Sequence, residues 1–209
     1  IIIATGGMPN LELFEKKQDL ENVYTSWDIL SGDIKLSDNI LIYDEAGDHT
    51  GMQSAEFAIK EGATVEFMTP DRLISSEIMG MNLTPYLKNL QNKKITYSIA
   101  KRLLDVSIKG NKLNAVIGSD YDENFKYNSS YDQVFLNYGI KPLDDLYFSL
   151  VPYSKNKGEI DYNKFINGEE QDIIKSNNNK FNLFRIGDAV SSRNIHAAIY
   201  DALRLVINL

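Results

Sequence analysis

The amino-acid sequence predicts an α/β protein built on a parallel β-sheet. Apolar runs of strand length alternate with helical segments, and one strand–turn–helix–strand unit spans residues 39–68. Its length of about thirty residues is what a right-handed crossover between parallel strands requires. The chain also closes with a strand, a glycine turn and an apolar helix, and its 209 residues are 43% apolar, enough for a hydrophobic core.

The N-terminal segment predicts one short strand and one short helix. Residues 1–3 are β-branched and are followed by two glycines and a proline, so the strand is expected to end there. Residues 25–32 begin with a capping box and end at a glycine, which favours one or two helical turns.

The middle segment predicts strand and helix in alternation. Residues 39–43 are an apolar strand, and residues 44–51 form a glycine-bearing turn. Residues 52–61 are expected to form a helix, which a glycine closes, and residues 64–68 the next strand. We therefore expect one β-turn-α-β unit here, with its two strands parallel.

A second helix and a β-rich region follow. Thr84 and Pro85 favour a helix start, because threonine is a good N-cap and proline suits the first helical position. From Lys94 the runs alternate, and Gly110 with Asn111 predicts a hairpin between two of them.

The C-terminal third is less regular. Residues 153–180 are polar and rich in Asn and Lys, and they predict little regular structure. Residues 181–186 predict a strand, and the residues from 194 onward predict an apolar helix.

Composition excludes several classes of site. The net charge of −7 argues against a nucleic-acid interface, which needs a basic face. The chain has no cysteine and only two histidines, so no disulfide, thiolate cluster or metal site is expected. Its apolar runs are shorter than the ~20 residues of a membrane span. We expect a cytoplasmic protein without a membrane partner.

The turn after residue 43 is a candidate nucleotide site with a degraded glycine fingerprint. His49, Gly51 and Ser54 stand where a dinucleotide-binding turn has three glycines that admit the pyrophosphate. Carboxylates at positions 44, 45 and 48 would repel phosphate unless they face away. Nucleotide binding and an inert scaffold both remain open on these residues.

The turn at Gly187 and Asp188 is a second candidate. An aspartate between a strand and a helix can accept hydrogen bonds from sugar-like hydroxyls, and the helix N-terminus stabilises negative charge. The alternative is that Asp188 only caps a turn. His196, in the first turn of the last helix, is by its position more often a packing or capping residue.

Four stretches in order resemble the trimethylamine dehydrogenase and 2,4-dienoyl-CoA reductase family, and most of all its NADH-oxidase-related and N-methylproline demethylase-like members. They are residues 1–10 (IIIATGGMPN), 39–58 (NILIYDEAGDHTGMQSAEFA), 132–142 (DQVFLNYGIKP) and 184–203 (FRIGDAVSSRNIHAAIYDAL). The first resembles the ATG strand of FAD-type domains, and the last resembles the GD motif that ends the family.

This resemblance implies a Rossmann-like NAD(P)-type domain at residues 36–136, inserted in the remainder of an FAD-type domain at residues 1–35 and 137–209. Such a two-domain arrangement is similar to that of glutathione reductase. The first FAD-binding βαβ unit would lie upstream, as would a flavin barrel holding FMN and an iron–sulfur cluster. The chain lacks an initiator Met, and we expect it to be a C-terminal fragment.

The resemblance also implies the cofactor contacts. In the FAD-type part they are Thr5, Gly6, Gly187, Asp188, Asn194, Ile195 and His196, and in the NAD(P)-type part His49, Gly51 and Ser54. The leading hypothesis is a module that passes reducing equivalents between NAD(P)H and flavin. The alternative is a non-redox domain that binds ADP or only supports the upstream barrel. The expected partners are the nucleotide cofactor and that barrel, and homo-oligomer formation is left open.

Overall fold

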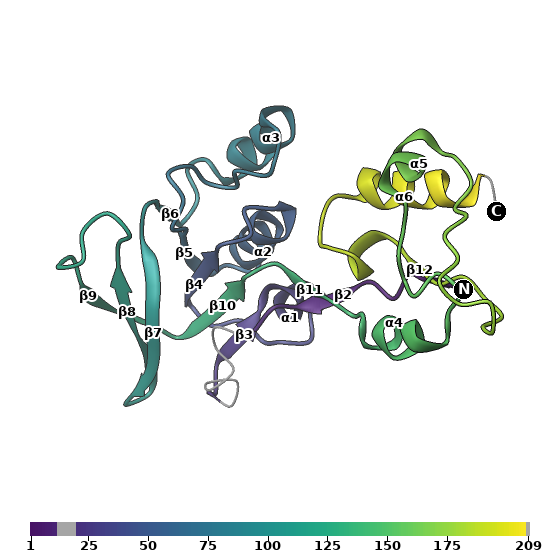
Figure 1. The fold of residues 1–209 in the computed structure, drawn as a ribbon. Helices are drawn as coiled ribbons and strands as arrows, with labels where there is room; N and C mark the ends of the chain where they lie inside the picture. The colour runs from purple at the N-terminus through teal and green to yellow at the C-terminus, as the bar shows by residue number, and fades with distance from the viewer. Residues whose placement is uncertain (12–19, 208–209) are drawn as a thin grey trace. The chain divides into compact units, whose positions relative to one another are not determined.

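The computed structural model describes residues 1–11 and 20–207. These residues divide into two compact units. In Figure 1 the first residues, in dark purple, belong with the green-to-yellow C-terminal part, and the residues between them form the other unit. The central unit contains residues 9–139, and the terminal unit contains residues 1–8 together with the described residues from 140 onward.

The central unit is built on five parallel strands in the order β3-β10-β4-β5-β6. They are β3 (Val23–Thr25), β4 (Asn39–Asp44), β5 (Thr64–Met68), β6 (Ile95–Ser98) and β10 (Gln133–Asn137). The predicted α/β class with a parallel sheet is confirmed. The inner strands β4 and β10 are buried almost throughout, which explains their continuous apolar sequences.

Helices and a second sheet cover the parallel sheet. The helices are α1 (Ser26–Ser31), α2 (His49–Lys60) and α3 (Gly80–Leu90), and the antiparallel sheet is β7 (Arg102–Lys109), β8 (Lys112–Gly118) and β9 (Tyr127–Tyr131). Ile40 and Ile42 of β4 pack with Met52 of α2, whereas Leu41 packs with Val106 of β7. Alternate residues of β4 therefore serve two cores, one on each face of the sheet (Figure 1).

Residues 9–11 and 20–35 lie in the central unit, whereas the resemblance implied that they belong to the FAD-type part. The physical reason is strand pairing, because β3 hydrogen-bonds to β10 in the parallel sheet. Which cofactor each unit serves stays a prediction.

Two helix starts differ from the sequence expectation. Helix α2 begins at His49 and not at residue 52, because the Asp48 side chain caps it by accepting the N–H of the second helical residue at 3.0 Å. Helix α3 begins at Gly80 and not at Thr84. The Thr84 hydroxyl donates to the Gly80 carbonyl at 2.8 Å, so it bonds inside the helix, and Pro85 lies in the helix interior.

The terminal unit has two short pairs of strands and a set of helices. Its elements are β1 (Ile2–Ile3), β2 (Gly7–Pro9), β11 (Ile140–Pro142), α4 (Asp145–Leu150), η2 (Val151–Tyr153), α5 (Tyr162–Asn167), β12 (Phe184–Arg185), η3 (Gly187–Ala189) and α6 (Ile195–Val206). Strands β1 and β12 run parallel, over a core of Ile3, Tyr147, Leu183 and Ala189. Helix α5 interrupts the segment expected to be irregular, because Asp161 caps its first turn. Within residues 1–11 and 20–207, no helix has the length and apolar character to span a membrane.

Candidate functional site

The turn after β4 is organised around the carboxyl group of Asp44. This last residue of β4 is fully buried. Its Oδ1 accepts hydrogen bonds from the Gly47 backbone N–H (3.0 Å) and from Nδ2 of Asn137 (2.8 Å). Its Oδ2 is buried without a hydrogen-bond partner among the described residues. Because burial disfavours the charged form, the pKa of Asp44 is raised to about 7.

Asn137, at the end of β10, joins three segments around this turn. Its Nδ2 also donates to Oδ1 of Asp48 at 3.0 Å, and its Oδ1 accepts from the Ser26 hydroxyl at 3.0 Å. Its side chain is 4% exposed, so these bonds are shielded from water. Sequence reasoning did not single out Asn137. The signal was a polar amide at the end of an otherwise apolar strand.

The three predicted nucleotide-binding positions all lie in the first half of α2. A Cβ at Gly51 would lie 2.7 Å from Cγ of Asp44, so this glycine makes room for that carboxyl group. Ser54 is buried and donates to the backbone carbonyl of Thr50 at 2.8 Å. His49 is exposed, with its Nδ1 3.1 Å from the Tyr86 hydroxyl. Their role in binding a nucleotide stays a prediction.

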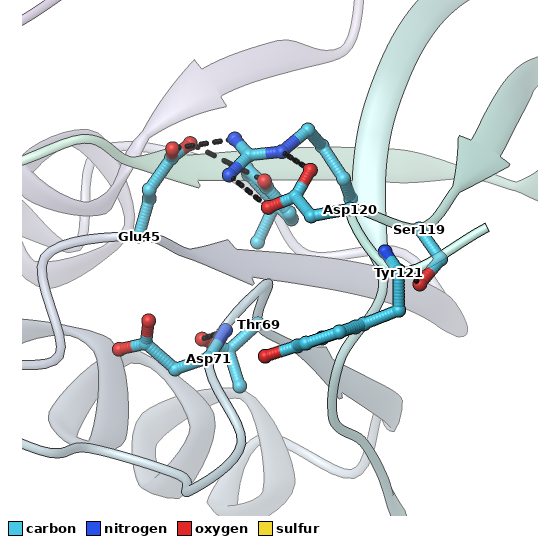
Figure 2. A network of polar contacts seen from close by, with 8 residues as sticks. Glu45, Thr69, Asp71, Ser119, Asp120 and Tyr121 are labelled. Carbon is cyan, nitrogen blue, oxygen red and sulfur yellow. Dashed lines mark hydrogen bonds and ion pairs between the residues drawn. The ribbon is translucent and has the colours of Figure 1, made fainter. Parts of the chain in front are cut away.

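Two carboxylates share one guanidinium beside this turn. Arg102 of β7 donates to Glu45 at 2.6 Å and, through two nitrogens, to both oxygens of Asp120 at 2.5 and 2.6 Å. Figure 2 shows Glu45 and Asp120 converging on it from opposite sides. The hydrogen bonds from Arg102 lower the pKa of Asp120. An arginine held by two acids is a poor phosphate ligand, because its donors are already engaged.

The residues that follow β5, where a ribose contact is expected, hydrogen-bond to other residues of the same loop. The Thr69 hydroxyl accepts from the backbone N–H of Asp71 at 3.2 Å (Figure 2). The Asp71 carboxylate accepts from the Ser76 hydroxyl at 3.0 Å. In the part of the chain that the structure describes, no three His, Asp or Glu side chains are arranged to hold a metal ion. The described carboxylates at the carboxyl ends of these strands therefore bond to neighbouring groups of the protein itself.

In the terminal unit, two segments predicted to contact flavin lie at the carboxyl ends of the parallel strands β1 and β12. Thr5 and Gly6 follow β1, and Gly187 and Asp188 follow β12; since these strands are parallel neighbours, both turns lie at their carboxyl ends. Asp188 is half-buried, and its Oδ1 accepts the Arg193 backbone N–H at a long 3.4 Å. A carboxylate so weakly engaged can accept hydrogen bonds from a ligand.

The first turn of α6 begins beside this edge. Asn194 caps the helix by accepting the N–H of its third residue at 2.9 Å. Asn194, Ile195 and His196 are all exposed. The structure thus brings Gly187 and Asp188 to the start of α6, where Asn194, Ile195 and His196 also lie, and their binding role stays a prediction.

Asp201 holds the glycine turn in place, and sequence reasoning missed it. Its carboxylate is 5% exposed, accepts the Gly187 backbone N–H at 3.1 Å and pairs with Arg193. An acid in the middle of an apolar helix was the available signal. Asp201 and Arg193 also line a cavity of about 440 Å³, together with Tyr147, Phe165, Phe184 and Arg185.

Two curated relatives match almost the whole chain. A probable N-methylproline demethylase of Rhizobium meliloti (strain 1021) is 50% identical over 206 residues, which are 99% of this chain and 30% of the relative. An N,N-dimethylglycine/sarcosine dehydrogenase of Chromohalobacter salexigens is 32% identical over 98% of this chain and 31% of the relative. The chain thus spans about a third of the length of these relatives. No protein-family model matches it.

Solved structures of low sequence identity share the fold. A 6-hydroxypseudooxynicotine amine oxidase of Pseudomonas geniculata N1 superposes with a TM-score of 0.71 at 20% identity, over 97% of this chain and 28% of the other. A bacillithiol disulfide reductase of Bacillus cereus superposes with a TM-score of 0.58 at 17% identity, over 98% of this chain and 57% of the other.

Over almost its whole length the chain is similar to one part of much longer oxidoreductases, and its fold is shared with flavoprotein disulfide reductases. More particularly, it belongs to the flavin oxidoreductases of the trimethylamine dehydrogenase and 2,4-dienoyl-CoA reductase type, and the resemblance found in the sequence is confirmed.

Proposed function

We propose that the chain is the C-terminal, nucleotide-binding-type part of a flavin enzyme that oxidatively removes methyl groups from small N-methylated amino acids. The names of the two curated relatives support this substrate class, since both point to amino acids with a methylated nitrogen. The FMN, the iron–sulfur cluster and the substrate site would belong to an upstream barrel, outside this chain.

Within this enzyme, the terminal unit would contribute one side of an FAD site. Flavin, when bound, supplies the redox chemistry, and the protein's part is to hold and orient it. The residues of this chain fit that part, because Asp188 offers a half-buried carboxylate with one long hydrogen bond, and the N-terminus of α6 adjoins it. Asp201 would position both by fixing the Gly187 backbone.

Replacing Asp188 by alanine in the full-length parent is expected to lower FAD retention about tenfold or more, because a hydrogen bond to a charged group contributes about 1.5–3 kcal/mol. The measurement is the FAD released per polypeptide after gel filtration and denaturation. Glu170→Ala, at an exposed position of the same unit, is the matched control. Equal FAD content in both variants would remove Asp188 from the site.

Two roles are open to the central unit. It could pass reducing equivalents between NAD(P)H and flavin, or it could support the enzyme without a redox nucleotide. The carboxyl group of Asp44 favours the second role, because it lies buried at the turn where a phosphate would have to sit. The residues of this turn do not fit a pyrophosphate.

Anaerobic mixing of the full-length parent with candidate reductants tests this choice. We expect N-methylproline or dimethylglycine to bleach the flavin absorbance, and NADH and NADPH to leave it unchanged over the same time. Rapid bleaching by a nicotinamide nucleotide would restore the relay role. Bleaching by neither amine would count against the proposed substrate class.

A further inference from the structure

The carboxyl group of Asp44 lies beside the N-terminal turn of α2. In working dinucleotide units a phosphate sits at the N-terminus of the helix that follows the first strand, where free N–H groups and the helix dipole attract it. Here Gly51, in the first turn of α2, faces the Asp44 carboxyl group. A Cβ at this position would lie 2.7 Å from Cγ, 2.8 Å from Oδ2 and 3.0 Å from Oδ1.

That acidic group is fixed from several sides. The Gly47 N–H and the Asn137 amide hold Oδ1, while Oδ2 is buried and unpartnered among the described residues. Asn137 in turn binds Asp48, the residue that caps α2. The carboxyl group therefore cannot swing out to make room without breaking a buried network.

We propose that the Asp44 carboxyl group takes the place of a phosphate at the N-terminus of α2 and closes the central unit to nucleotide phosphates. This inference deepens the supporting role proposed above and rests on it. The space that a phosphate would fill beside the partly positive N-terminus of α2 is occupied by a side chain of the protein itself.

The position of Asp44 explains why the incomplete glycine fingerprint of this turn keeps its middle glycine. Of the three glycine positions only the middle one keeps its glycine, at Gly51. In a nucleotide-binding unit such a glycine admits the pyrophosphate. In this chain it admits the Asp44 side chain, so the glycine persists for a reason internal to the protein.

The proposal is tested with Asp44 variants of the full-length parent, each saturated with FAD. Calorimetry then measures the affinity of each variant for ADP and for inorganic pyrophosphate. Asp44→Gly removes both the volume and the charge of the side chain, and we expect at least a tenfold gain in affinity over the wild type. Asp44→Asn keeps the volume and removes the charge, and we expect no gain.

Two results would overturn the proposal. No gain with a folded Asp44→Gly protein overturns the proposal, and so does an equal gain with Asp44→Asn, since charge alone would then exclude phosphate. If Asp44→Gly fails to fold, Asp44→Ser keeps a hydroxyl near the Gly47 N–H and takes its place. Flavin reduction of the wild type by NADH would instead refute the supporting role, so the two failures are distinguishable.

Discussion

Replacing Gly51 by alanine is expected to lower the free energy of unfolding of the central unit by about 2 kcal/mol. In an open helix this substitution would stabilise by about 1 kcal/mol, because alanine has the higher helix propensity. Here the new methyl group would meet the Asp44 carboxyl group at 2.7 Å, and overpacking of a buried site costs about 1–3 kcal/mol. Displacing that carboxyl group would also break its bond to Asn137. The expected sign is therefore the reverse of the propensity.

Urea denaturation of the single variants and of a double variant measures this effect. Gly80→Ala is the matched control, because a Cβ there meets no atom within 4 Å at the start of α3. In an Asp44→Gly background the cost of Gly51→Ala should vanish, giving a coupling energy between the two positions. If Gly51→Ala proves as stable as Gly80→Ala, the packing described for Asp44 is wrong.

Asp44→Asn is expected to gain stability relative to the wild type as the pH rises from 5 to 8. Burial raises the pKa of Asp44 to about 7 in the folded state, whereas an unfolded aspartate releases its proton near pH 4. Between these values the folded state holds the extra proton, so the free energy of unfolding of the wild type falls as the pH rises. The neighbouring Asp48 carboxylate acts in the same direction.

The expected change in the difference between the two proteins is on the order of 2 kcal/mol over this range. Chemical denaturation at a series of pH values measures it. Glu61→Gln, at the exposed far end of α2, controls for general charge effects and should follow the wild type. Parallel pH curves for Asp44→Asn and the wild type would mean that Asp44 ionises as an ordinary surface acid.

The strands could be predicted from the sequence, but the hydrogen bond between the last residues of β4 and β10, Asp44 and Asn137, could not. Strands β4 and β5 and the hairpin at Gly110 were predictable, because apolar runs and turn residues are local signals. The network of Ser26, Asp44 and Asn137 joins residues far apart in the chain, and only the order of strands in the sheet brings them together. Periodicity carries no information on that order.

The acidic turn shows the same limit at the candidate site. From the sequence, the carboxylates at positions 44, 45 and 48 were expected to face away from a phosphate or to repel it. The structure gives each a different partner: Asp44 faces Gly51, Glu45 bonds to Arg102, and Asp48 caps α2. The direction of a side chain at a strand end depends on tertiary neighbours, which residue types alone do not specify.

The two acidic side chains at the N-terminus of α2 have a consequence for what the central unit needs in order to be stable. Nucleotide-binding domains commonly leave a helix end unsatisfied until their ligand arrives, and ligand supply then adds to their stability. The central unit places Asp44 and Asp48 at that end from its own sequence. We therefore expect the stability of the central unit not to depend on the concentration of nucleotide.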